Sequence, residues 1–186
     1  MPFATAHAQE INLVPNPGFE EFLFCPGSHS TRPHEFGATH WRSASTLGTP
    51  DHFHACSSGE ADVPHNWAGV SDAYTGQGYA GIYMWMATQN YREYLQCQLT
   101  EPLIADSLYY IRFRYKLSSY SKYAIDRIGL LLTDNPVSVK HDKPIVLIPT
   151  FAVVQDSALT PQTGLWEEAS FDYVAHGGER FLTLGN

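Results

Sequence analysis

Strict alternation of apolar and polar residues is the feature of this sequence that most limits how the chain can fold. In residues 94–99, Leu95, Cys97 and Leu99 fall on one face of an extended segment, and residues 107–117 alternate in the same way. Successive side chains point to opposite faces in a β-strand. Twelve prolines and fourteen glycines punctuate the 186 residues, and few windows carry the apolar period of a helix. The chain is therefore predicted to be all-β, an antiparallel β-sandwich.

Composition limits the number of domains and the class of partner. With 44% hydrophobic and 13% aromatic residues, the chain can bury one core, so residues 11–186 are predicted to form a single domain. The net charge is −8 and the eleven Lys and Arg residues are scattered, which argues against nucleic acid as a partner. No run approaches the ~18 apolar residues of a membrane span, so direct membrane insertion is not expected.

Residues 1–10 have part of the pattern of an export signal. Ala6-His7-Ala8 has the small-x-small form of a signal-peptidase site, although the basic and long apolar regions that normally precede it are absent. We interpret residues 1–10 as a signal-peptide remnant; the alternative is an unstructured start with incidental alanines. Export is compatible with the three cysteines, which would form one disulfide and leave one thiol.

Residues 22–64 are predicted to be a long loop, and two of the cysteines lie in it. If residues 52–56 are extended, His52, His54 and Cys56 point the same way, and with Cys25 they would form a Cys₂His₂ set suited to zinc. The alternative is a Cys25–Cys56 disulfide that closes the loop and leaves the histidines half exposed. We favour the disulfide, because the signal-like start indicates an oxidising compartment.

The segment NLVPNPGFEE, residues 12–21, is predicted to be a short strand and a turn, and it resembles the opening of a known family. It is similar to β-sandwich carbohydrate-binding modules of the galactose-binding-like jelly-roll superfamily. The resemblance implies a jelly roll and a structural calcium, for which Glu20 is the matching position. Related modules continue for one more strand after the segment that matches residues 177–186. The resemblance thus implies either a fragment of a larger protein that lacks its last strand, or a sheet with an exposed edge.

Further motifs narrow this resemblance. They follow one another in the order found in an uncharacterised extracellular domain family: GTPDHFHAC at 48–56, VPHNWAG at 63–69, TGQGYAG at 75–81, YREY at 91–94 and YAIDRIG at 123–129. Those domains lie on the N-terminal side of secreted and outer-membrane proteins, often ahead of a peptidoglycan-binding domain of the outer-membrane-protein-A type. The resemblance implies a secreted or outer-membrane location.

The candidate ligand-binding residues are aromatic and polar side chains near the turn at 75–81, in a predicted strand at 82–86 and in the loop at 118–123. An aromatic plane can cover the C–H face of a sugar while fixed donors bind its hydroxyl groups. The same residue types are ordinary in β-sheets, which is the structural alternative. The candidates are Tyr83, Trp85, Tyr91, Arg92, Tyr94, Tyr120 and Tyr123.

The sequence lacks the common catalytic motifs. It contains neither GxSxG nor HExxH, and the adjacent pairs Glu20-Glu21 and Glu167-Glu168 would point to opposite faces of a strand. Asp51 and Asp126 would form a hydrolytic site only if the fold brought them together. The sequence therefore predicts that the chain is not an enzyme but an extracellular module that binds a glycan or cell-surface polysaccharide. The alternative is a structural or adhesive spacer that contacts other proteins at the cell envelope.

Overall fold

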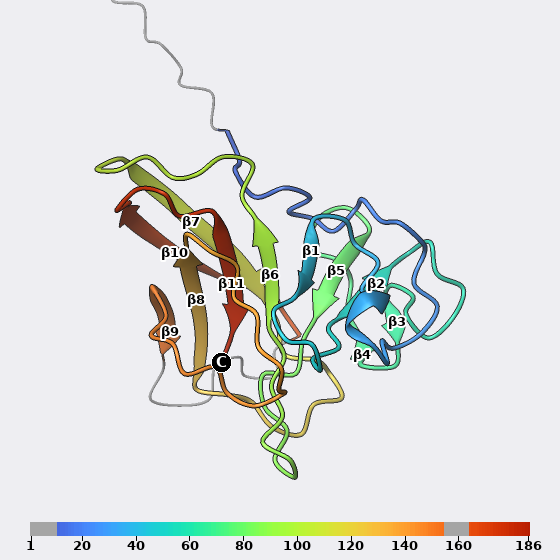
Figure 1. Cartoon of the computed structure of the whole chain (residues 1–186). Helices are drawn as coiled ribbons and strands as arrows, with labels where there is room; N and C mark the ends of the chain where they lie inside the picture. Colours follow the sequence, from blue (N-terminus) through green and yellow to red (C-terminus); the bar gives the residue numbers. More distant parts are fainter. Residues whose placement is uncertain (1–10, 155–163) are drawn as a thin grey trace, which may run out of the picture.

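The computed structural model describes residues 11–154 and 164–186. The predicted signal-peptide remnant, residues 1–10, lies outside the described residues. The largest sheet is antiparallel and has five strands (Figure 1), in the order β1-β6-β11-β8-β9. The strands of this sheet are β1 (Trp41–Ser43), β6 (Leu95–Gln98), β11 (Phe181–Gly185), β8 (Arg127–Thr133) and β9 (Phe151–Val154). The described residues contain no α-helix, and no helix among them is long and apolar enough to cross a membrane.

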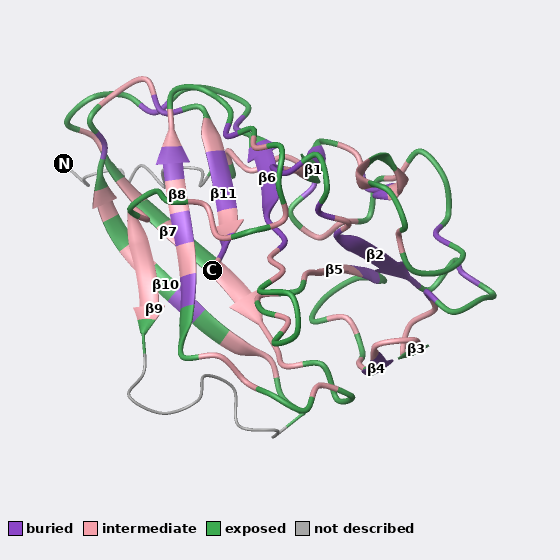
Figure 2. Ribbon diagram, turned by 60° about the horizontal axis from the view of Figure 1, so that its bottom comes forward, coloured by how far each residue is buried: buried purple, intermediate pink, exposed green. Residues whose placement is uncertain are grey.

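A second sheet packs against the first. It consists of β7 (Leu108–Tyr115) and β10 (Glu167–Val174), which pair antiparallel over their whole length. Ile111 and Phe113 of β7 and Tyr173 of β10 pack on a buried cluster that includes Leu130 of β8 and Leu182 of β11. Within these two sheets, Figure 2 shows the buried positions concentrated along β6, β8 and β11. The predicted all-β class is therefore confirmed: the chain is an antiparallel β-sandwich of the jelly-roll class.

A third group of elements lies beside the sandwich, and we call it the lateral region (Figure 1). It contains the short helix η1 and two small antiparallel sheets. Their bounds are η1 (Pro33–Glu35), β2 (Asp51–His54) paired with β5 (Gly78–Gly81), and β3 (His65–Asn66) paired with β4 (Gly69–Val70). All four residues of β2 are buried, although the sequence predicts a loop there.

The alternating segments form strands where the sequence predicts them. In β6, Leu95 and Cys97 point into the main core, and Leu99 packs there directly after the strand. Burying one such leucine stabilises the fold by about 1.5–3 kcal/mol. The opposite face of β6, however, is not open as expected. Gln96 is fully buried and donates hydrogen bonds to the Val137 carbonyl and the Thr183 hydroxyl.

Two predicted strands are absent. Residues 82–86 do not form a strand, because the Tyr83 backbone is bonded at both ends to Glu93: its N–H donates to Glu93 Oε2 and its carbonyl accepts the Glu93 N–H. Residues 12–14 also lack strand structure. Leu13 instead packs against the core, and its carbonyl accepts hydrogen bonds from the Thr100 N–H and the Thr100 hydroxyl.

The chain order of the five-stranded sheet corrects two further expectations. Residues 22–64 are not a plain loop, since they supply β1, an edge strand of this sheet, and β2. β11 lies in the middle of the sheet, hydrogen-bonded to β6 on one side and β8 on the other. The less favoured alternative, in which the final strand leaves the sheet with an exposed edge, is therefore wrong for β11; the preferred alternative, a fragment of a larger protein, stays a prediction.

Candidate functional site

The predicted ligand-binding residues do not form one platform. Trp85 and Tyr123 make an exposed edge-to-face pair with ring centroids 5.9 Å apart, and Tyr120 is exposed without a ring partner in the described residues. Tyr94 is buried, and its hydroxyl donates to the Asn186 carbonyl and accepts the Ile145 N–H. The set therefore divides into separate groups with different surroundings.

Tyr83 and Tyr91 belong to a chain of aromatic rings in the lateral region, which we call the aromatic ladder. Neighbouring rings in it have centroids 5.0 to 6.3 Å apart. The ladder consists, in order, of Trp166, Tyr79, Phe53, Trp67, Tyr83 and Tyr91. Phe53 is buried, Tyr83 is 39% exposed and the other four rings are half-buried, so the ladder is a packed cluster that is partly open to solvent. Ligand binding by Tyr83 and Tyr91 stays a prediction.

Arg92 follows the aromatic ladder in the chain. Its Nη1 donates to the Tyr91 carbonyl at 3.1 Å, while its Nε is buried without a partner in the described residues. Burial lowers the pKa of the Arg92 guanidinium. No carboxylate of the described residues forms an ion pair with it.

Two buried carboxyl groups, those of Glu93 and Asp51, lie next to the aromatic ladder. Glu93 accepts four hydrogen bonds: two from Thr49, one from the Tyr91 hydroxyl and one from the Tyr83 N–H. Asp51 accepts the Ser30 N–H at 2.6 Å. Burial first, and then the nearby charge of Glu93, raise the pKa of Asp51 to about 7. Asp51 therefore holds its proton into the neutral range.

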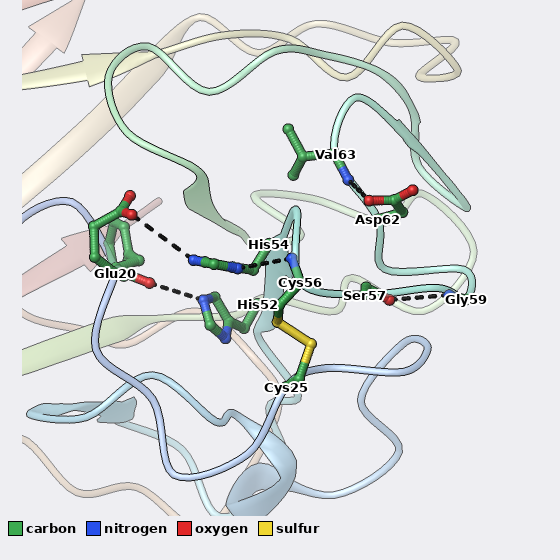
Figure 3. The surroundings of a disulfide bond; sticks show 10 residues. Glu20, Cys25, His52, His54, Cys56, Ser57, Gly59, Asp62 and Val63 are labelled. Carbon is green, nitrogen blue, oxygen red and sulfur yellow. Dashed lines mark hydrogen bonds and ion pairs between the residues drawn. A yellow bond between two sulfur atoms is a disulfide. The ribbon is translucent and has the colours of Figure 1, made fainter.

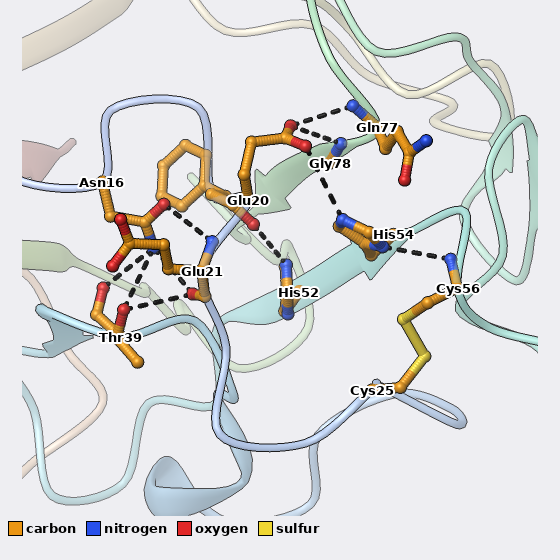
Figure 4. Close-up of polar contacts among 11 residues, drawn as sticks. Asn16, Glu20, Glu21, Cys25, Thr39, His52, His54, Cys56, Gln77 and Gly78 are labelled. Atoms are coloured by element: carbon orange, nitrogen blue, oxygen red, sulfur yellow. Dashed lines mark hydrogen bonds and ion pairs between the residues drawn. A yellow bond between two sulfur atoms is a disulfide. The ribbon is translucent and has the colours of Figure 1, made fainter.

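The region of the predicted calcium and zinc sites is shown in Figures 3 and 4. Cys25 and Cys56 form a disulfide, which confirms the prediction and removes both thiolates from the zinc alternative. His52 and His54 lie on one side of β2, as expected for an extended segment, with ring centroids 5.8 Å apart. They are 2% and 4% exposed, so the expectation of half-exposed histidines is wrong.

The Glu20 carboxylate is bonded to the protein in this structure (Figure 4). Its Oε1 accepts hydrogen bonds from the N–H groups of Gln77 and Gly78, and its Oε2 lies 3.8 Å from His54 Nε2. Gly76 has φ +68°, and a Cβ there would lie 2.3 Å from Glu20 Oε1, so glycine is required for this close approach. Within the described residues, no group of three or more His, Cys, Asp or Glu could hold a metal ion. The calcium at Glu20 stays a prediction.

A groove of about 650 Å³ lies between the two sheets, where β8 and β10 end and β9 and β11 begin. Its lining is about equally apolar and polar. The lining residues are Leu131, Leu132, Asp134, Ile148, Thr150, Phe151, Tyr173, His176, Gly177 and Glu179. The volume is within the range of ordinary small-molecule sites, ~300–1,000 Å³.

Glu179 is a polar group of the groove that is held by three hydrogen bonds. Its Oε1 accepts hydrogen bonds from the Tyr173 hydroxyl at 2.5 Å and the His176 N–H at 2.8 Å, and its Oε2 accepts the Gly177 N–H at 2.8 Å. Burial alone would raise the pKa of Glu179, but these hydrogen bonds lower it overall. Burial and the bond to Glu179 raise the pKa of Tyr173 to about 12. The pair is thus a fixed carboxylate and a neutral phenol.

His176 and Asp134 complete the polar end. The His176 ring lies edge-on to Tyr173 with centroids 6.2 Å apart, and a Cβ at Gly178 would lie 3.8 Å from the Asp134 carboxyl carbon. Gly177 and Gly178 have φ +96° and +99°, which allow the tight turn between β10 and β11. Sequence reasoning missed this site. The sequence feature that could have indicated the site is the segment 176–179, in which a histidine and a glutamate flank two glycines.

Comparisons with known proteins identify a similar fold. No family model matches the chain, and no curated protein matches its sequence. A solved structure with a similar fold is that of a Stig cyclase from Fischerella sp. TAU, in complex with (3Z)-3-(1-methyl-2-pyrrolidinylidene)-3H-indole. The TM-score is 0.53 and the identity 13%, over 92% of this chain and 86% of that chain. At this identity the similarity shows the fold alone.

These findings correct the predicted function. The similar fold belongs to an enzyme solved with a small organic molecule, which contradicts the non-catalytic glycan-binding module and the prediction that the chain is not an enzyme. The spacer alternative gains no support. The physical reason is visible in the aromatic ladder, whose rings are used in packing, whereas the groove is formed by residues that were not candidates. The resemblance to galactose-binding-like modules stays a prediction.

Proposed function

We propose that this chain is an enzyme that binds a small heteroaromatic molecule in the groove between its sheets and catalyses a proton transfer on it. The groove carries the proposal, because it combines a suitable volume, apolar side chains for a ring to pack against and a hydrogen-bonded carboxylate at its polar end. The fold similarity to a cyclase solved with an indole-containing ligand supports the choice of ligand class.

The charges at the polar end favour a ligand with a positive or N–H-bearing part. Asp134 and Glu179 line the groove, and no lysine or arginine does among the described residues. Three donors fix Glu179 as a carboxylate, which makes it suited to stabilise positive charge that develops on a bound ring. Phe151 and Tyr173, with centroids 5.5 Å apart, provide aromatic surface against which a flat ligand can pack.

His176 is the residue proposed to move the proton. An imidazole can both donate and accept a proton near neutral pH, and this side chain is exposed at the edge of the groove. In the proposed step, His176 protonates a ring carbon of the ligand. The resulting cation is stabilised by Glu179, and the ring later returns a proton to the neutral imidazole.

Binding is tested with two probes that share a ring but differ in charge, tryptamine and indole-3-acetate. Methyl resonances of Leu131, Leu132 and Ile148 should shift on adding tryptamine, with weaker or absent binding of indole-3-acetate. Glu179→Gln should weaken tryptamine binding by about tenfold or more, since hydrogen bonds to charged groups contribute ~1.5–3 kcal/mol. Asp172→Asn, an exposed carboxyl on β10, is the matched control and should bind tryptamine normally. Equal affinity for both probes would refute the proposed site.

Catalysis is tested with a proton-transfer reaction of indole itself. Protonation at C3 followed by loss of a proton exchanges the C3 hydrogen in D₂O, and proton NMR follows the loss of its signal. The protein should accelerate this exchange, and His176→Gln should abolish the acceleration. His141→Gln, an exposed histidine outside the groove, should retain it. Exchange at the rate of buffer alone would contradict the enzymatic part of the proposal.

An extracellular location is part of this proposal. The Cys25–Cys56 disulfide has both cysteines exposed, and an exposed disulfide persists in an oxidising compartment. Thiol trapping after expression in the cytoplasm and in the periplasm would test it. Full oxidation only in the periplasmic sample is expected, whereas free Cys25 and Cys56 in that sample would contradict it.

A further inference from the structure

A second, smaller cavity lies in the lateral region beside the disulfide. It has a volume of about 190 Å³, room for a molecule of a few heavy atoms at ~30 Å³ per water. One wall is the segment 26–30 with Phe24, which the Cys25–Cys56 disulfide ties to the end of β2. Glu35 of η1 and His52 of β2 complete the lining.

His52, one of the lining residues, has an unused acceptor on its ring. Its Nε2 lies 2.9 Å from the Phe19 carbonyl, and because a carbonyl only accepts, Nε2 carries the ring hydrogen. Nδ1 then has a lone pair, and it is buried without a partner in the part of the chain that the structure describes. In Figures 3 and 4 this nitrogen points away from the Phe19 contact, toward the side on which the chain runs to Cys25. A buried acceptor without a hydrogen-bond donor is uncommon, so we expect a ligand that supplies the donor.

The ring is electrically neutral in this position. Burial is the main cause that lowers the pKa of His52, and the neighbouring His54 lowers it further. The hydrogen bond to Phe19 and the charge of Glu20 act in the opposite direction but do not outweigh burial. A neutral ring with a free lone pair favours a ligand that donates a hydrogen.

The surrounding charges are negative. Glu35 lines the cavity, and its Oε2 is held by the N–H groups of Thr31 and Arg32 and by the Thr31 hydroxyl. One further carboxylate, Glu60, lies behind the wall, where it accepts the Ser28 hydroxyl at 2.6 Å. Asp51, which accepts the Ser30 N–H, adds a negative charge only above about pH 7. No lysine or arginine lines the cavity among the described residues.

We propose that this cavity binds a small organic ammonium ion. One N–H of the ligand donates to His52 Nδ1, the Glu35 carboxylate balances its charge, and the Phe24 ring covers its alkyl part. A neutral alcohol lacks the charge, and a quaternary ammonium lacks the N–H, so both bind less well. The site is separate from the groove between the sheets and does not depend on what binds there.

The probe for this site is ethylammonium chloride, with ethanol and tetramethylammonium chloride as the matched controls. In protein labelled with ¹⁵N-histidine, the Nδ1 resonance of His52 should move upfield in a saturable way with ethylammonium, as expected when a lone pair accepts a hydrogen bond. The controls should leave it nearly unchanged. Glu35→Gln should weaken ethylammonium binding at least about fivefold, because it removes a charge-assisted contact. Glu101→Gln, an exposed carboxyl outside this cavity, should bind normally.

Several results would overturn the proposal. They are an unchanged His52 Nδ1 resonance up to saturating ethylammonium, the same shift with ethanol, or equal affinity in the Glu35→Gln and Glu101→Gln proteins. His52 itself is left unaltered in these measurements, since replacing a buried ring would disturb β2 and its contacts with Phe22 and Phe36. The protein is used with its disulfide intact.

Discussion

Replacing Asp51 by asparagine should stabilise the protein at neutral and alkaline pH and change little in acid. Asp51 is 5% exposed and lies near Glu93, and burial first and then the charge of Glu93 raise its pKa from 3.8 to about 7, although hydrogen bonding to Ser30 acts in the opposite direction. Between these two values the unfolded chain loses this proton while the folded protein keeps it. The folded state then binds more protons, so its stability falls as pH rises.

The size of the effect follows from the width of that interval. One pH unit corresponds to about 1.4 kcal/mol, so ionising Asp51 costs up to about 4 kcal/mol once the pH exceeds 7. Below pH ~4 both states are protonated and the cost vanishes. In Asp51→Asn the side-chain carbonyl can still accept the Ser30 N–H, but there is no charge to bury.

The assay is urea unfolding of both proteins, followed by tryptophan fluorescence, from pH 4 to pH 8.5. The free energy of unfolding of Asp51→Asn minus that of the wild type should rise from near zero in acid to about 4 kcal/mol at pH 8. Asp172→Asn, which removes an exposed carboxyl, should show no such trend. If the difference were independent of pH, or if Asp51→Asn were less stable throughout, Asp51 would be ionised in the folded protein and the reasoning would fail.

Two other predictions concern the cysteines. Burial raises the pKa of Cys97 to about 12, so iodoacetamide at pH 8 should leave it unmodified in the folded protein and alkylate it fully in urea; modification of the native protein would contradict its burial in β6. The Cys25–Cys56 disulfide closes a loop with a sequence separation of 31, so Cys25→Ser with Cys56→Ser should cost about 3–4 kcal/mol of stability, measured by urea unfolding against the oxidised wild type. An unchanged midpoint would show that the lateral region does not need this link.

The strands that could be predicted from the sequence are those with one face packed on the core and the other exposed to solvent. In β7, Ile111 and Phe113 pack on the core while Arg112 is exposed, so the period of two is visible in the sequence. β1 has only three residues, and its partner β6 lies more than fifty positions further along the chain. Such a strand forms through long-range pairing, which leaves no local signal.

The candidate site was less predictable than the fold. The disulfide could be inferred, because cysteine number and an export-like start restrict the choices. The groove could not, because β8, β9 and β10 and the turn after β10 each supply part of its lining. Aromatic residues near Tyr83 were predicted to bind a ligand. The sequence pattern of an aromatic side chain is the same whether its ring packs against other rings or contacts a ligand.

Carboxylates explain why the lateral region has an ordered structure with so few strands. Glu20 accepts the backbone N–H of Gln77, 57 positions away, and Glu93 accepts that of Thr49, 44 positions away. Each charged acceptor supplies the hydrogen bonds that a neighbouring strand would otherwise provide, and such bonds are stronger than neutral ones. These links join segments that have no alternating pattern, so the sequence could not reveal them.

A buried carboxylate also holds the turn at the groove, where Glu179 accepts hydrogen bonds from the N–H groups of His176 and Gly177. Because the turn is held by its own carboxylate, the His176 ring can remain exposed without being needed for packing. A side chain that the fold does not need for stability is free to meet a ligand. We therefore expect the His176→Gln protein to lose proton transfer to indole, while its free energy of unfolding in urea stays within about 0.5 kcal/mol of the wild-type value. Loss of both together would assign His176 to the fold rather than to the reaction.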